Sequence, residues 1–141
     1  MKFSKINYQE LNGKQKENYN YHKIASALAE YGFNLMRLSD DWQGADALAC
    51  HIDGNTFLKI QIKGRWGLFK KYIGKDIYIA FIEKSTLYCY PHDELLEYPQ
   101  AKSYLSTKSW LKKGDYHSGN IPKKLRSFFE QYSLITKPLI S

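Results

Sequence analysis

The sequence predicts an α/β fold in which an N-terminal helix is followed by a mixed, mostly antiparallel β-sheet flanked by helices. The first observation is an amphipathic helix over residues 12–31, which contains no proline, carries apolar residues at helical spacing and is followed by Gly32. A second helix, basic and aromatic, is expected over residues 122–132. Between the helices lie five β-rich runs, at residues 34–38, 45–52, 56–63, 76–83 and 86–90.

Turn residues connect these runs into hairpins. Asp53-Gly54-Asn55 separates the second run from the third, and an Asp-Gly step between apolar runs favours a tight turn. Only Lys84 and Ser85 separate the fourth run from the fifth, which predicts a close antiparallel pair. A short helix is expected over residues 92–98, the polar stretch 99–120 has no assignment, and the residues after Tyr132 are expected to form a tail.

Length and charge indicate one basic domain. A chain of 141 residues can bury a core without disulfides or structural metals, so we expect a single domain over residues 1–141. The net charge is +7, and the basic C-terminal extension, residues 101–141, carries +6 of it. Such a charge favours a polyanionic partner, although lysines also simply keep small domains in solution.

Other residue types exclude several classes of protein. The chain has two cysteines and four histidines, and neither set has the spacing of a disulfide framework or a zinc site. No apolar run approaches the length of a membrane span, and the N-terminus lacks the apolar stretch of a signal peptide. We therefore expect a cytoplasmic protein.

Two strands and one helix carry the residues that suggest chemistry. Strand alternation places Gln61 and Lys63 on one face of residues 56–63, although an ordinary half-exposed strand has the same pattern. The predicted hairpin folds Asp46 back toward Gln61 and Lys63. Asp46 could alternatively be an ordinary turn residue after Gly44. Glu17 lies two helical turns before Ile24 and three before Leu28, so we expect it on the inward, apolar face of the helix. Its alternative role is only to stabilise the helix N-terminus through the helix dipole.

Together these residues resemble the PD-(D/E)XK nuclease superfamily, in the variant with glutamine in place of the second acidic residue. Mrr-like restriction enzymes and some group I intron homing endonucleases have this variant. The resemblance rests on Glu17, Gly44-Ala45-Asp46 and Gln61-Ile62-Lys63-Gly64-Arg65, and it covers about residues 13–83. It implies a restriction-endonuclease-like core and a metal-dependent endonuclease that hydrolyses DNA phosphodiester bonds.

The same resemblance implies a role for each residue. Asp46 would bind Mg²⁺ directly, Glu17 directly or through water, and Gln61 through its carbonyl oxygen, with Mn²⁺ as a substitute for Mg²⁺. Lys63 would position or deprotonate the attacking water. Because Gln61 brings no charge, metal affinity should be weaker than with an acidic residue at this position. A non-catalytic nucleic-acid-binding module or complex subunit is the alternative. An RNA nuclease is a third possibility.

Further basic residues, from Arg65 onward, are expected to bind the phosphates of duplex DNA. The residues predicted for this role are Arg65, Lys70, Lys71, Lys112, Lys113, Lys123, Lys124 and Arg126. In the stretch 64–75 the aromatic residues Trp66, Phe69 and Tyr72 would either stack on bases or form a lid over the core. Whether the protein acts as a homodimer or a higher oligomer is left open.

Overall fold

The computed structural model describes residues 1–135, and its centre is a six-stranded sheet with the strand order β1-β2-β3-β5-β6-β8. The strands are β1 (Phe33–Trp42), β2 (Ala45–His51), β3 (Phe57–Ile62), β5 (Ile77–Glu83), β6 (Thr86–Pro91) and β8 (Ser133–Leu134). Strands β3 and β5 are parallel, whereas each other neighbouring pair is antiparallel. The predicted fold class, a helix followed by a mixed, mostly antiparallel sheet, is confirmed.

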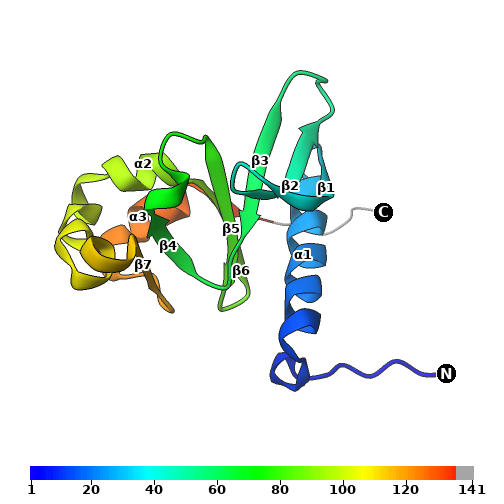
Figure 1. Cartoon of the computed structure of the whole chain (residues 1–141). Helices are drawn as coiled ribbons and strands as arrows, with labels where there is room; N and C mark the ends of the chain where they lie inside the picture. Colours follow the sequence, from blue (N-terminus) through cyan, green and yellow to red (C-terminus); the bar gives the residue numbers. More distant parts are fainter. Residues whose placement is uncertain (136–141) are drawn as a thin grey trace.

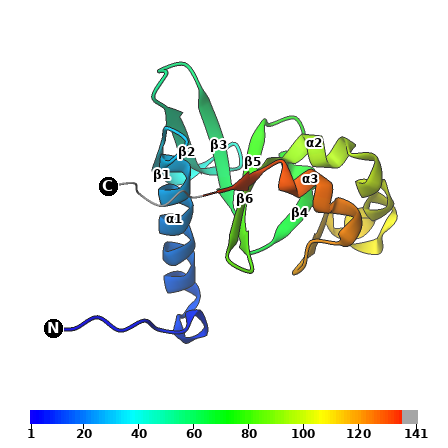
Figure 2. The same ribbon diagram turned by 180° about the vertical axis from the view of Figure 1, so that it is seen from behind.

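Helices and short turns cover the sheet (Figures 1 and 2). Helix α1 lies along the β1–β3 half, while α2, α3 and a two-stranded sheet of β4 and β7 gather beside β5 and β6. These elements are α1 (Gly13–Ala29), α2 (His92–Glu97), α3 (Arg126–Glu130), β4 (Trp66–Phe69) and β7 (Asp115–Ser118). Shorter helical turns are η1 (Tyr8–Glu10), η2 (Lys70–Tyr72), η3 (Pro99–Ser106), η4 (Ser109–Lys113) and η5 (Lys123–Leu125).

Helix α1 begins and packs as its sequence predicts. Asn12 caps it, because its side chain accepts from the Gln15 N–H while the Gln15 side chain accepts from the Asn12 N–H, each at 2.9 Å. Ile24 and Leu28 lie in a buried cluster with small residues of the sheet, Ala47, Ala49 and Ala80 among them. These alanines let the helix approach the strands closely, which anchors the β1–β3 half.

The aromatic residues of 64–75 form part of the core rather than a base-stacking surface. Trp66, Phe69 and Tyr72 are 0%, 6% and 3% exposed, in the cluster beneath α2 and α3. The expectation that they stack on bases is therefore wrong, and the lid alternative describes them correctly. Trp66 and Phe69 lie in strand β4, which the sequence patterns did not predict. Strand β4 pairs with β7, a strand far along the chain, so no local pattern indicated it.

The C-terminal segment belongs to the same core and departs from the predicted elements in two places. The expected helix over 122–132 is divided into η5 and α3, because Leu125 has φ −106° and ψ −1° where the two meet. Its apolar stripe is buried as expected. Instead of a tail, β8 pairs with β6. Residues 136–141, including the Lys137 counted in the basic extension, lie outside the described residues.

Within residues 1–135, no helix combines the length and the apolar composition needed to cross a bilayer.

Gly44 fixes the turn that leads into β2. Its φ is +91°, a conformation that favours glycine, and a Cβ atom there would lie 2.9 Å from the Tyr72 ring. The Gly44 N–H donates to the Asp41 carboxylate at 2.9 Å. Asp46 follows two residues later, so the contact between this turn and Tyr72 helps to determine where its side chain lies.

Replacing Gly44 tests this contact. Gly44→Ala is expected to lower the free energy of unfolding by about 2 kcal/mol, roughly half from left-handed backbone strain and the rest from the clash with Tyr72. Gly54→Ala is the matched control, because Gly54 has φ +75° but no atom within 4 Å of an added Cβ. Urea denaturation measures both variants. Equal losses would mean that the Tyr72 contact contributes nothing.

Candidate active site

Asp46 faces Gln61 across the antiparallel pair of β2 and β3. The register pairs Ala47 with Ile60, which places Asp46 and Gln61 at the next position. The Gln61 amide donates to Asp46 Oδ2 at 3.3 Å, and the Ile62 N–H donates to Asp46 Oδ1 at 3.3 Å. Both hydrogen bonds are long, so the carboxylate is held in position but only weakly satisfied.

The surroundings of Asp46 disfavour its charged form. Burial raises its pKa above the usual value, and this effect outweighs the Ile62 N–H and the positive charges of Arg37 and Lys63, which act in the opposite direction. A half-buried carboxylate of this kind gains from a nearby cation that replaces the lost water. Asp46 is therefore suited to bind a cation or a protonated group.

Lys63 follows β3 and lies against an aromatic wall. Its Nζ is 4.8 Å from the centre of the Phe69 ring and 5.6 Å from that of Tyr72. Burial lowers the pKa of Lys63, and the like charge of Lys71 lowers it further, against the opposing effect of Asp46 and two other carboxylates. The Lys63 amine therefore loses its proton more readily than an exposed lysine does.

All four predicted catalytic residues line one cavity of about 620 Å³, namely Glu17, Asp46, Gln61 and Lys63. Glu17, however, is not on the inward stripe of α1 as expected. Its side chain is 72% exposed and pairs with Lys14 at 3.6 Å. The first turns of α1 extend beyond β1 and β2 (Figures 1 and 2), so a residue there lacks a sheet to pack against.

Arg37 is a cavity residue that sequence patterns missed. It lies in β1, donates from Nη1 to Asn18 Oδ1 at 2.9 Å, and covers the Tyr21 ring at 4.1 Å. In the sequence, the single feature that could have indicated Arg37 is its position near the end of the predicted strand at residues 34–38. Lys14 and Lys16 also line the cavity, while Arg37 and Lys63 are the cations whose charges act on Asp46.

The side chains of the site carry oxygen atoms of the kind that Mg²⁺ binds, but these atoms are not assembled around a common point. Mg²⁺ prefers oxygen ligands and retains several waters, so one or two carboxylates with an amide oxygen suffice. Asp46 and Glu17 offer carboxylates, whereas Gln61 turns its nitrogen toward Asp46 and would have to rotate its amide to offer oxygen there. Over residues 1–135, no three His, Cys, Asp or Glu side chains form a cluster that could hold a metal.

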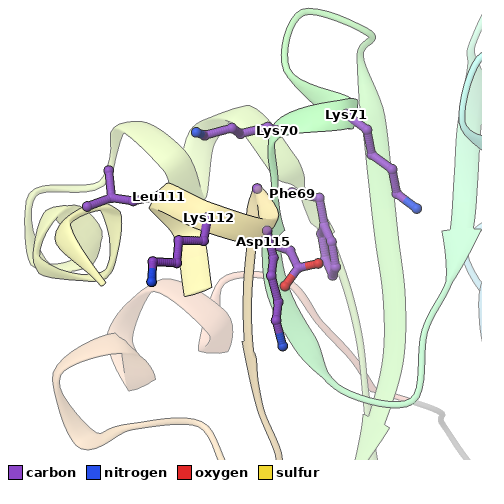
Figure 3. Close-up of a pocket in the computed structure, with 8 residues that line it drawn as sticks. Phe69, Lys70, Lys71, Leu111, Lys112 and Asp115 are labelled. Carbon is purple, nitrogen blue, oxygen red and sulfur yellow. The ribbon is translucent and has the colours of Figure 1, made fainter. Parts of the chain in front are cut away.

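Four of the predicted phosphate-binding residues gather at a neighbouring cavity of about 540 Å³ (Figure 3). Lys70 and Lys71 come from η2, and Lys112 and Lys113 from η4. Phe69 also lines this cavity and contacts Lys63, so the lysine cluster lies next to the candidate active site. This arrangement brings lysines about forty positions apart in the sequence to one cavity, which the Asp115 carboxylate also lines.

The other predicted phosphate-binding residues lie elsewhere. Arg126 Nη1 donates to the buried Glu83 carboxylate at 2.9 Å, and Lys124 Nζ donates to Ser103 Oγ at 2.7 Å. Arg65 and Lys123 are exposed and line neither cavity. Because Glu83 neutralises Arg126 and thereby fastens the C-terminal segment to β5, we expect Arg126 to contribute little to binding phosphate.

Removing the charge of Asp46 tests its energetic role. Because its folded-state pKa is raised, proton binding stabilises the fold, and this stabilisation is lost as the pH rises through that pKa. Asp46→Asn is therefore expected to raise the thermal midpoint at pH 7 by a few degrees, roughly the effect of 1 kcal/mol. The gain should vanish below the ordinary pKa of 3.8. A large fall at pH 7 would instead make Asp46 a structural residue.

Comparisons with known proteins give one result. No protein-family model matches the chain, and no curated protein matches it. Among solved structures, the bacterial homing endonuclease I-Ssp6803I is similar to this chain, with a TM-score of 0.49, 19% sequence identity and 86% of each chain covered. An overlap this loose supports no conclusion about activity, which has to come from the residues of the site.

Proposed function

We propose that this protein is a metal-dependent endonuclease that hydrolyses DNA phosphodiester bonds, in restriction, mobility or repair. The observation that carries the proposal is the meeting of Asp46, Gln61 and Lys63 at one end of β2 and β3, in a cavity that Arg37 and other cations make positive. A carboxylate and an amide oxygen can hold a metal ion, and a lysine of lowered pKa can serve as a general base, so together these groups can support phosphodiester hydrolysis.

Each residue has a chemical role in this proposal. Asp46 would hold Mg²⁺ directly, Glu17 directly or through water, and Gln61 through its amide oxygen. When bound, the ion supplies a Lewis acid and lowers the pKa of its water. The Lys63 amine accepts the proton of the attacking water as its oxygen bonds to phosphorus and one ester P–O bond breaks, and the leaving ester oxygen takes up a proton from solvent water. Arg37 would offset the charge that develops on the phosphate oxygens.

Cleavage of supercoiled plasmid DNA tests the proposal. Wild-type protein is expected to nick the plasmid with Mg²⁺ or Mn²⁺ and to be inactive in EDTA. Lys63→Met should lower the rate by roughly 10²- to 10⁴-fold, the usual loss of a general base, and Asp46→Asn should abolish cleavage. Gel electrophoresis measures the products.

Two matched variants control for nonspecific effects. Lys59→Met changes a lysine of β3, the strand that Lys63 follows, and Lys59 does not line the cavity. Asp76→Asn changes an exposed carboxylate with φ +57°, which asparagine tolerates. Both should cleave like wild type. Cleavage that survives Lys63→Met and Asp46→Asn would exclude this site as the catalytic centre.

The pH dependence of cleavage should report Lys63. If neutral Lys63 is the base, kcat/KM rises with pH through its pKa. Lys71→Gln removes a like charge that lowers this pKa, so the rise is expected to move to higher pH, with reduced activity at pH 7 that recovers in alkaline solution. Lys59→Gln should leave the profile in place. An unchanged profile for Lys71→Gln would mean that another group is the base.

The lysines that line the second cavity should bind DNA phosphates without regard to base sequence. If Lys112 and Lys113 each neutralise one phosphate, replacing both by glutamine should flatten the plot of log affinity against log salt by about 1.8, at about 0.9 per contact. The same change at Lys123 and Lys124 tests whether phosphate contacts extend to η5. An unchanged slope for the Lys112 and Lys113 variant would mean that other residues bind the phosphates.

One observation favours a second candidate, a nucleic-acid-binding module without turnover. Glu17 is exposed and paired with Lys14, and Gln61 presents its nitrogen to Asp46, so the metal ligands are not pre-assembled. Salt-dependent DNA binding by wild-type protein without cleavage in Mg²⁺ or Mn²⁺ would favour this candidate.

A further inference from the structure

A separate cavity of about 420 Å³ opens beside the candidate active site, between α1 and the turn that joins β5 to β6. We call it the side pocket. Three of its lining residues, Tyr8, Asn20 and Gly64, also line the active-site cavity, so the two spaces adjoin. Nothing in the proposed cleavage chemistry uses the remaining residues of the side pocket.

The walls of the side pocket combine aromatic, apolar and cationic groups. The rings of Tyr8 and Tyr19 lie 5.3 Å apart, and Tyr19 is 42% exposed. Ile82 and Leu87 add apolar surface, and Lys23 places its amine 5.5 Å from the centre of the Tyr19 ring. Exposed aromatic rings beside lysines are the elements with which proteins hold single nucleotides, because bases stack on rings while amines bind phosphates.

The turn at the rim of the pocket is strained. Lys84 and Ser85 have φ values of +47° and +69°, so both residues of this two-residue hairpin turn are left-handed. Such turns favour Asn-Gly, and other residues are destabilising there. The strained turn nevertheless has a lysine, which lines the side pocket. Binding of an anionic group would account for a residue that the local backbone disfavours.

We propose that the side pocket holds an unpaired nucleobase next to the phosphodiester that the protein cleaves, with Lys23 and Lys84 as phosphate ligands and with Tyr19 as the stacking surface once the Lys23 amine moves from above its ring to a phosphate. The substrate is then DNA with an unpaired or easily extruded nucleotide at that position, because a base inside a duplex cannot reach a pocket. The position beside the cleavage site rests on the proposed function, whereas nucleobase binding does not.

Fluorescence titration in EDTA tests the proposal with two DNAs, a duplex carrying one unpaired 2-aminopurine nucleotide and its fully paired counterpart. Wild-type protein is expected to bind the first more tightly and to change its fluorescence as the base stacks. Tyr19→Ala should weaken binding of this DNA by about 5- to 150-fold, the usual effect of removing one stacking ring, and leave the paired duplex unaffected. Tyr19→Phe keeps the ring and should bind as wild type.

The turn provides a second readout. The double change of Lys84→Asn with Ser85→Gly relieves the backbone strain, so it is expected to raise the thermal midpoint while weakening binding of the unpaired DNA. A purely structural role would raise the midpoint and leave binding unchanged, which would exclude Lys84 from the pocket's function.

Failure of this proposal is distinguishable from failure of the proposed nuclease. Equal wild-type affinity for the two DNAs, or an equal loss for both in Tyr19→Ala, would overturn nucleobase binding whether or not plasmid DNA is cleaved. Because the titration contains no metal ion, absence of cleavage leaves its result intact.

Discussion

The antiparallel register of β2 and β3 is the constraint on which the candidate site depends. It sets Asp46 opposite Gln61 and brings the Ile62 N–H to the same carboxylate. A shift of one residue would turn Asp46 toward α1, among the alanines and aliphatic residues that bury that face. Gly44 before β2 and Lys63 after β3 both pack against the Tyr72 ring, and Lys63 also lies over the Phe69 ring. These two rings therefore contact both ends of the hairpin.

The Phe69 ring connects the candidate active site to the C-terminal half of the chain. The Phe69 N–H donates to the buried His92 at 2.8 Å, and the Tyr90 hydroxyl exchanges hydrogen bonds with the Gly67 backbone at 2.7 and 3.0 Å. These contacts hold β4, and with it the ring that lies beneath the Lys63 amine. Residues remote in sequence therefore hold the ring beneath Lys63 in place, while burial and the nearby Lys71 lower the pKa of Lys63.

The basic residues of the C-terminal third serve different purposes. Arg126 neutralises the buried Glu83 and Lys124 covers the Tyr104 ring, so both help to fasten this segment to the core. Lys112 and Lys113 instead meet Lys70 at a cavity beside the active site (Figure 3). Net charge alone thus indicates a polyanionic partner, while the packing of each side chain decides which charges remain available to it.

Local patterns determined much of this protein. Apolar spacing and the stop at Gly32 located α1, and strand alternation with the Asp53-Gly54 turn placed Asp46 beside Gln61, because these signals act between near neighbours. Tertiary structure alone decided the β4–β7 and β6–β8 pairings, the burial of Trp66 and the exposure of Glu17. Pairing and burial depend on partners far along the chain, and no local pattern specifies which partner a strand or ring will meet.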